Sequence, residues 1–173
     1  MTQSVLNQIK ADAIANSTYT NNILFTLVKS ILHPGMQMLF LYRIEKKIRN
    51  IKYLGMVLGR ILRSVSVVLT GCHISPEADI KEGIIIPHAN GIVIGERTII
   101  EVGVCIYQQV TIGVTDRKSS SYPIINEGAI LYAGSKIIGG VVIGKHAVIG
   151  TNAVVTKSIP DNSVAVGVPA RVL

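Results

Sequence analysis

Aliphatic residues recur at every sixth position through the second half of this sequence, and this spacing constrains the fold more than any other feature. They form three runs in register: Ile74, Ile80 and Ile86; Ile94, Ile100, Ile106 and Ile112; and Ile125, Leu131, Ile137, Ile143, Ile149 and Val155. The residue four positions later is small or β-branched in nine cases, namely Ala78, Thr98, Val104, Val110, Ala129, Ser135, Val141, Ala147 and Ala153. An α-helix needs spacings of three and four, and an ordinary strand needs strict alternation, so neither explains this period.

A period of six fits a coil with three flat sides. Each hexad forms one side, its long aliphatic residue fills the triangular interior, and the small residue points into the same narrow space. Glycines follow the aliphatic position in four hexads, where tight turns and close backbone approach favour them: Gly95, Gly113, Gly144 and Gly150. The pattern therefore predicts a parallel β-helix of about four coils over residues 71–173.

The repeat is interrupted twice. The register shifts by two residues between Ile86 and Ile94, beside His88, and a polar segment from Val114 to Pro123 separates the second run from the third. Regular hexads build only a scaffold, so we expect the functional site at these two irregularities.

Residues 1–70 lack the six-residue period and predict α-helices instead. Ile23, Leu24, Leu27, Val28 and Ile31 recur at helical spacing up to Pro34, which ends or kinks that helix. A further helix is predicted from Tyr53 to Leu69. The chain thus divides into an α-helical N-terminal region and a β-helix domain.

The formal net charge of +7 belongs to residues 1–70, because residues 71–173 hold equal numbers of basic and acidic side chains. Basic residues gather from Arg43 to Lys52. We interpret this stretch as a solvated helical face, since it has little aromatic interleaving. The alternative is a surface for a membrane or a nucleic acid.

Several protein classes are excluded by composition. Two cysteines, Cys72 and Cys105, are too few for a disulfide framework and lack metal-ligand spacing. The polar opening of the chain is not a signal peptide. No stretch reaches 18 uninterrupted apolar residues, so we reject a transmembrane helix and expect a cytoplasmic protein.

Four motifs identify a family resemblance. They are His88-Ala89-Asn90-Gly91-Ile92-Val93-Ile94-Gly95-Glu96, Val110-Thr111-Ile112-Gly113, Ala133-Gly134-Ser135-Lys136-Ile137 and Gly167-Val168-Pro169-Ala170-Arg171. With them, residues 74–173 resemble the hexapeptide-repeat acyltransferases and look most like the serine acetyltransferases. The resemblance implies a left-handed β-helix, a homotrimer with active sites between subunits, and acetyl-CoA as the acyl donor.

The resemblance also implies roles for single residues. His88 matches the catalytic base of the family, and histidine suits this task because its unperturbed pKa is near 6.5. A backbone N–H near Gly113 and Val114 would stabilise the oxyanion. We interpret His33, His73 and His146 as ordinary surface or hydrogen-bonding histidines. The loop from Thr115 to Ser121 would reach over the active site, or it is an ordinary excursion.

Coenzyme A binds between neighbouring β-helices in the family. The matching residues here are Gly113, Ala133, Gly134, Thr151 and Asn152. Small residues at these positions would let the pantetheine arm approach the backbone. Lys157 and Arg171 are candidates for its phosphates, although either could be a solvated charge.

Departures from the family pattern concern the acceptor. Carboxylates that the serine enzymes use are replaced by His73 and Pro87, and loosely by His33. An Arg-His pair is replaced by Ser121-Tyr122. A serine ammonium and carboxylate would therefore lack partners, so we expect the acceptor to be a sugar hydroxyl in surface-polysaccharide biosynthesis, at the cytoplasmic side of a membrane.

Candidate acceptor contacts are His73, Glu96 and Tyr122, and a backbone carbonyl or Glu96 would orient His88. Two further acceptors stay open: L-serine, as in cysteine biosynthesis, and the amino group of an amino sugar.

Other functions on this fold fit less well. The γ-type carbonic anhydrases need a closely spaced histidine pair, which is absent because His73 and His88 are 15 positions apart. We therefore expect no metal site. A solenoid without catalysis is disfavoured by the intact motif at His88.

Overall fold

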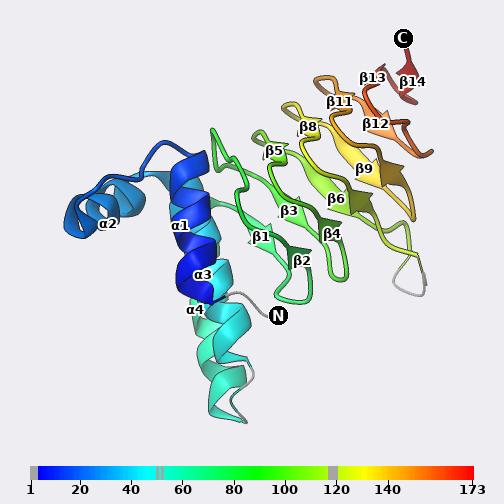
Figure 1. The fold of residues 1–173 in the computed structure, drawn as a ribbon. Coiled ribbons are helices and arrows are strands. Elements are labelled where there is room, and N and C mark those ends of the chain that lie inside the picture. Colours follow the sequence, from blue (N-terminus) through cyan, green and yellow to red (C-terminus); the bar gives the residue numbers. More distant parts are fainter. Residues whose placement is uncertain (1–3, 50, 52, 117–120) are drawn as a thin grey trace.

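The computed structural model describes residues 4–49, 51, 53–116 and 121–173. Four helices precede a stack of short strands (Figure 1): α1 Val5–Ala15, α2 Ile23–Leu32, α3 Pro34–Ile48 and α4 Leu54–Thr70. The strands of the first two coils are β1 His73–Ile74, β2 Asp79–Ile80, β3 Val93–Ile94, β4 Ile99–Ile100 and β5 Cys105–Ile106. Those of the next are β6 Thr111–Gly113, β7 Ile124–Ile125, β8 Ile130–Leu131, β9 Lys136–Ile138, β10 Val142–Ile143 and β11 Val148–Ile149. β12 Val154–Val155, β13 Val164–Val166 and β14 Arg171–Val172 complete the stack.

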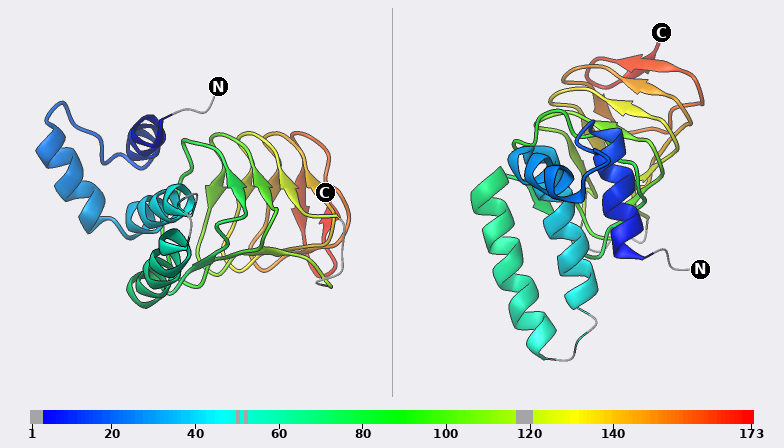
Figure 2. Two further views of the ribbon diagram at one scale, coloured as in Figure 1. Left: turned by 90° about the horizontal axis from the view of Figure 1, so that it is seen from below. Right: turned by 60° about the vertical axis from the view of Figure 1, so that its left-hand side comes forward.

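The strands form the three walls of a left-handed parallel β-helix. One wall has the order β1-β3-β6-β9-β12, the second β10-β7-β4-β2 and the third β14-β13-β11-β8-β5. Residues of one hexad position lie over each other, as Ile94 lies beside both Ile74 and Ile112. β14 pairs antiparallel with β13 and ends the third wall. The predicted fold is confirmed, and Figure 2 shows the coils stacked with the helices at one end.

The interior is built as the period predicts. The aliphatic hexad residues are at most 9% exposed, and the small residues four positions later at most 6%. The hydroxyls of Thr98 and Ser135 are buried there without a hydrogen-bond partner. The narrow interior therefore accommodates aliphatic and small side chains, but it leaves these two hydroxyls without hydrogen bonds.

The predicted close approach at glycine is found at two of the four positions. Gly144 and Gly150 allow close approach, because a Cβ there would collide with Asp161 and Val166 respectively. The left-handed backbone conformation falls at other positions, which form two columns: Gly71, Gly91, Gln109, Gly134 and Asn152, and Gly83, Gly103, Gly128, His146 and Asn162. Glycine and asparagine adopt positive φ at little cost, so these columns turn the chain at two corners of each coil.

The helices follow the predicted boundaries. α2 ends at Leu32 and α3 begins at Pro34, with a bend of 104° between them. Proline is favoured at the first position of a helix because its missing N–H would have no partner there. His33 caps α3, since its Nδ1 accepts a hydrogen bond from the Met36 N–H at 3.3 Å. This contact gives His33 a structural role.

α3 closes the first coil of the β-helix. Arg43, 3% exposed, pairs with Asp12 of α1 at 2.7 Å and donates to the Ile80 carbonyl at 3.0 Å. The Tyr42 hydroxyl donates to the Ala78 carbonyl at 2.7 Å. The buried aliphatic core thus ends against a polar layer that hydrogen-bonds the open edge of the first coil.

The predicted solvated basic face is therefore only partly correct. Lys47 is exposed, but Arg43 is buried, and Lys46 and Arg49 pair with Asp79 and Glu77 of the first coil. The spacing of three along α3 puts these cations on the side that faces the β-helix. Asn50 and Lys52, at the end of the stretch, lie outside the described residues.

Among the described helices, no single one is long and apolar enough to cross a membrane. The bent pair of α2 and α3 meets the criteria of length and composition only when both helices are taken together.

Candidate functional site

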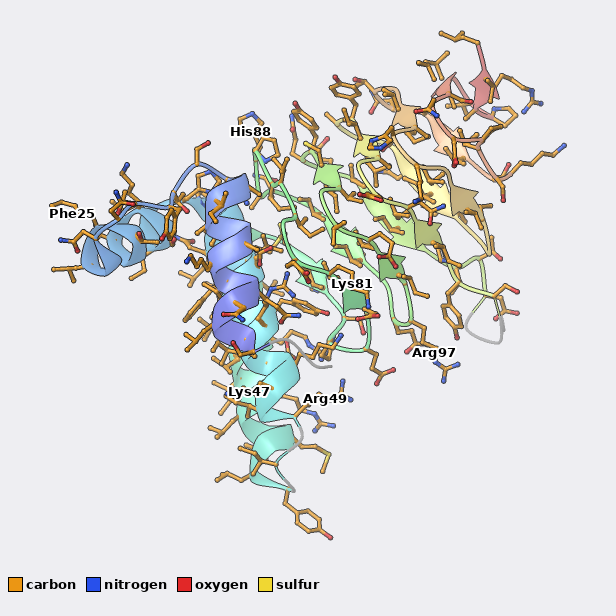
Figure 3. All side chains as sticks on the ribbon, in the orientation of Figure 1. Phe25, Lys47, Arg49, Lys81, His88 and Arg97 are labelled. Atoms are coloured by element: carbon orange, nitrogen blue, oxygen red, sulfur yellow. The ribbon has the colours of Figure 1, made fainter. Side chains whose placement is uncertain are left out.

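His88 lies in a widened corner of the first coil. This corner is two residues longer than its equivalent in the next coil: Ile92 comes six positions after Ile86, whereas Val110 comes four positions after Ile106. The extra residues push Pro87–Ala89 outward, and the Asn90 N–H turns back to the His88 carbonyl at 3.1 Å. The imidazole is exposed at the edge of the β-helix (Figure 3). The predicted register shift thus presents a histidine to a ligand instead of burying it.

Two tyrosines continue the row that begins at His88. The His88 and Tyr107 rings are 6.4 Å apart and tilted by 58°, and the Tyr107 and Tyr132 rings stack at 5.0 Å. Both distances lie in the range in which aromatic pairs attract. Nearby Cys105, then burial and Tyr132, raise the pKa of Tyr107.

Neither tyrosine is among the predicted site residues, although their place in the six-residue repeat could have indicated them. Tyr107 and Tyr132 directly follow the interior residues Ile106 and Leu131, just as Pro87 follows Ile86. Equivalent hexad positions stack, so an aromatic residue at this position lies beside the one in the next coil.

Four predicted coenzyme A residues belong to the same column of corners as His88. The Asn152 N–H donates to the Ala133 carbonyl, and the Gly134 N–H donates to the Gln108 carbonyl, each at 2.9 Å. The Asn152 side chain lies over Gly134, where a Cβ would collide with Oδ1. A larger residue at position 134 would displace this amide.

This column contains no acidic residue. Its corner segments, 87–92, 107–110, 132–135 and 150–153, hold no Asp, Glu, Lys or Arg. Lys136 borders the column, and its Nζ donates to the Gln109 carbonyl. The sequence analysis did not single out this lysine, which brings one positive charge to the edge of an otherwise uncharged surface.

The remaining predicted site residues lie at the opposite border of the β1-β3-β6-β9-β12 wall. Glu96, Tyr122 and Lys157 belong to the corners that follow this wall, and Gly113 ends β6. The Tyr122 hydroxyl lies 3.3 Å from Arg97 Nη1, and the Arg97 guanidinium lies over its ring. Figure 3 shows Arg97 on the other side of the β-helix from His88. Within one chain, Glu96 and Tyr122 do not reach His88.

The outer face of this wall joins the two borders. His73 is exposed on it, and its strand pairs with β3 at Val93. Gly113 leaves open space, because a Cβ there would meet nothing within 4 Å. Arg171 is exposed on β14, at the far end of the stack. Of the loop from Thr115 to Ser121, residues 117–120 lie outside the described residues.

His146 is separate from this surface. It lies at positive φ in the other column of corners, with its ring against Gly128. Within the described ranges, no group of three His, Cys, Asp or Glu side chains could hold a metal ion. What the His88 surface offers is an exposed imidazole beside small residues.

Comparisons with known proteins agree on one family. The profile described as "Bacterial transferase hexapeptide (six repeats)" matches residues 122–157. The serine acetyltransferase of Helicobacter pylori strain J99 is 35% identical over 144 residues, which cover 83% of each chain. That of Haemophilus influenzae is 46% identical over 101 residues, 58% of this chain and 38% of the relative.

Solved structures give the same result over almost the whole chain. Serine acetyltransferase in complex with CoA superposes with a TM-score of 0.83 at 34% identity, covering 98% of this chain and 70% of that one. The complex with cysteine gives a TM-score of 0.86 at the same identity and coverage. This chain spans 38% and 58% of the Haemophilus influenzae and Synechococcus elongatus relatives. The repeat, the His88 corner and these similarities together show that the chain belongs to the serine acetyltransferase family of hexapeptide-repeat transferases.

Proposed function

We propose that this protein is an acetyl-CoA-dependent O-acetyltransferase in which His88 is the general base. The observation that carries the proposal is the position of His88, exposed in a widened corner above the small residues Ala133, Gly134 and Thr151. A thioester lying along this column would bring its carbonyl carbon towards the imidazole. The similarity to a serine acetyltransferase solved with CoA supports this donor.

The reaction needs a base, an oxyanion donor and proximity. His88 takes the hydroxyl proton of the acceptor as its oxygen attacks the thioester carbonyl. A backbone N–H near Gly113 of a neighbouring copy of the chain would stabilise the oxyanion of the tetrahedral intermediate, because Gly113 lies at the other border of the wall from His88. Collapse of the intermediate breaks the C–S bond, leaves the acetyl ester, and returns the proton from His88 to the coenzyme A thiolate.

L-Serine is the acceptor that the relatives support, in place of the sugar hydroxyl predicted from the sequence. The relatives named above are serine acetyltransferases, at 35–46% identity. A sugar hydroxyl keeps one specific observation in its favour: no carboxylate lies in the His88 column to pair with an ammonium. Tyr107 and Tyr132 would suit the C–H face of a sugar ring.

A homotrimer completes the site in this proposal. His88 lies at one border of the β1-β3-β6-β9-β12 wall, in the same column of corners as Ala133 and Asn152. Glu96, Tyr122 and Lys157 lie at the other border. A neighbouring β-helix packed beside the first would bring the second set of residues opposite His88.

An acceptor screen with acetyl-CoA tests the proposal. Release of coenzyme A thiol is followed with L-serine, nucleotide sugars and amino sugars. We expect turnover with L-serine. Turnover confined to a sugar hydroxyl would establish the second candidate, and turnover confined to amines would show N-acylation.

The His88→Ala variant connects turnover to the proposed base. We expect turnover to fall by about a hundredfold or more, since a positioned base contributes roughly 10²–10⁴ in rate. His146→Ala is the matched control, because this exposed histidine lies at a different corner. Unchanged turnover in His88→Ala would remove the proposed mechanism.

A further inference from the structure

The surface of the helical region displays no carboxylate. Residues 1–70 contain two acidic residues, Asp12 and Glu45, which are 1% and 4% exposed. Asp12 pairs with Arg43, and Glu45 pairs with Arg63 at 2.7 Å. Among the described residues of this region, the exposed basic ones are Lys10, Lys29, Lys47, Arg49 and Arg60. Folding therefore hides both negative charges and leaves a surface of only one sign.

α2 is oriented opposite to an ordinary surface helix. Its polar Thr26 is 7% exposed, and the Thr26 hydroxyl bonds the Thr20 N–H at 2.8 Å and the Asn22 carbonyl at 3.1 Å. Five of its apolar side chains point outward instead: Leu24, Phe25, Val28, Ile31 and Leu32 are 45–74% exposed. A helix at a protein surface normally buries its apolar stripe. We call these five side chains the α2 apolar face.

The α2 apolar face is also free of the rest of the molecule. α2 projects sideways from the other helices and away from the β-helix (Figures 1 and 2). Phe25 points further outward from it in Figure 3. Lys29 is exposed at the margin of the apolar face, because helical periodicity puts it next to Phe25 and Leu32. The face can meet a broad, flat partner without rearrangement of the fold.

We infer that α2 docks the protein on an anionic lipid surface. Only a membrane interface offers both negative headgroups and an apolar layer a few ångströms below them. The α2 apolar face would enter this layer, and Lys29 would remain among the headgroups. Residues 13–44 contain no Asp or Glu, so no part of this segment would repel anionic lipid.

Two other occupants fit the surface less well. A second copy of α2 would bring two Lys29 side chains together with no carboxylate of α2 between them. A nucleic acid would satisfy the cations but leave five large apolar side chains against phosphates. A lipid partner accounts for the charge and the apolar face together.

Vesicle co-sedimentation of the full chain tests the inference. Vesicles of phosphatidylcholine alone are compared with vesicles of equal parts phosphatidylcholine and phosphatidylglycerol. We expect sedimentation with the mixed vesicles, weakened by salt. Replacing two large apolar contacts, in Phe25→Ser/Leu32→Ser, should lower the partition coefficient by about tenfold or more. Lys29→Glu should lower it by about fivefold or more.

The control removes exposed apolar side chains elsewhere. Val168 and Leu173 are 72% and 84% exposed at the far end of the β-helix. Val168→Ser/Leu173→Ser should sediment like the wild type. Circular dichroism verifies that each variant is folded, and turnover with a soluble acceptor should be unchanged.

Three outcomes would overturn the inference. The first is wild-type protein that stays in solution with the mixed vesicles. The second is equal loss of binding in the control variant. The third is self-association without vesicles that Phe25→Ser/Leu32→Ser abolishes, since this would assign the face to a second copy. Acetyl transfer is measured separately, so failure of docking leaves the proposed reaction untouched.

Discussion

The β-helix and the helices use the same kind of side chain in opposite ways. Ile137 of the β-helix is fully buried, whereas Ile61 of α4 is 54% exposed. α4 exposes a whole stripe of such residues: Leu54, Val57, Leu58, Ile61, Val65, Val68 and Leu69. A coil encloses its aliphatic residues by its own geometry, but a helix buries its stripe only when another element covers it. Hydrophobic periodicity therefore predicts which residues are buried in the β-helix. In the helices it predicts only which residues share one face, not whether that face is buried.

The largest effect is expected where the two regions join. Arg43→Met leaves Asp12 buried without its partner, and loss of one member of a buried ion pair costs about 3–5 kcal/mol. We expect this loss in the free energy of unfolding measured with urea. In Arg43→Met/Asp12→Asn the loss should be smaller, because a neutral amide is cheaper to bury. A loss below about 1 kcal/mol, as for an exposed pair, would show that the helices do not depend on this contact.

A matched pair of substitutions tests the contrast in burial itself. Ile137→Ala creates a cavity in the narrow interior and should cost about 2–5 kcal/mol. Ile61→Ala removes the same atoms from an exposed position and should change stability by at most about 0.5 kcal/mol. Urea unfolding of both variants measures the difference. A large cost for Ile61→Ala would mean that a partner chain covers α4.

A smaller effect is expected beside His88. Tyr107→Leu removes the ring that packs against the imidazole, and an aromatic pair contributes about 0.5–1.5 kcal/mol, equivalent to a loss of roughly two- to tenfold in kcat. Tyr107→Phe keeps the ring and should keep kcat. Steady-state kinetics at saturating acetyl-CoA separates kcat from KM. Equal losses in the Leu and Phe variants would point to the hydroxyl instead of the ring.

The smallest effect is expected to increase stability. The Ser135 hydroxyl is buried without a hydrogen-bond partner, and an unsatisfied group of this kind costs about 1 kcal/mol or more. Ser135→Ala should therefore raise the free energy of unfolding by about 1 kcal/mol. Tyr132→Ala, at an exposed position three residues earlier, is not expected to stabilise the chain. A destabilised Ser135→Ala would indicate an internal water at this hydroxyl.

Much of the β-helix could be predicted because its information is local. Each hexad specifies one side of a coil, and equivalent positions in successive hexads become neighbours. The boundary between α2 and α3 was predictable for the same reason, since Pro34 lacks the N–H that a continuing helix needs. The stacking of Tyr107 on Tyr132 was also predictable, because both residues occupy the same position in the repeat.

The rest depended on contacts between distant segments. Asp12 and Arg43 are 31 positions apart, and no local pattern announces that they pair. The hidden carboxylate of Glu45 and the outward turn of the α2 apolar face also depend on how the helices pack. These contacts changed a basic stretch, expected to be solvated, into a partly buried layer on the first coil.

The sequence by itself determined the coil, its interior and the corner where His88 leaves the regular repeat. In a six-residue repeat, the position of a residue in the hexad decides whether it is buried and which residues of the next coil lie beside it. The tertiary structure decided which charges remain at the surface and which side of α2 faces outward. Helical periodicity defines the two faces of α2 but does not say which one is buried. Contacts with α3 and with the segment before α2 select the face of Thr26.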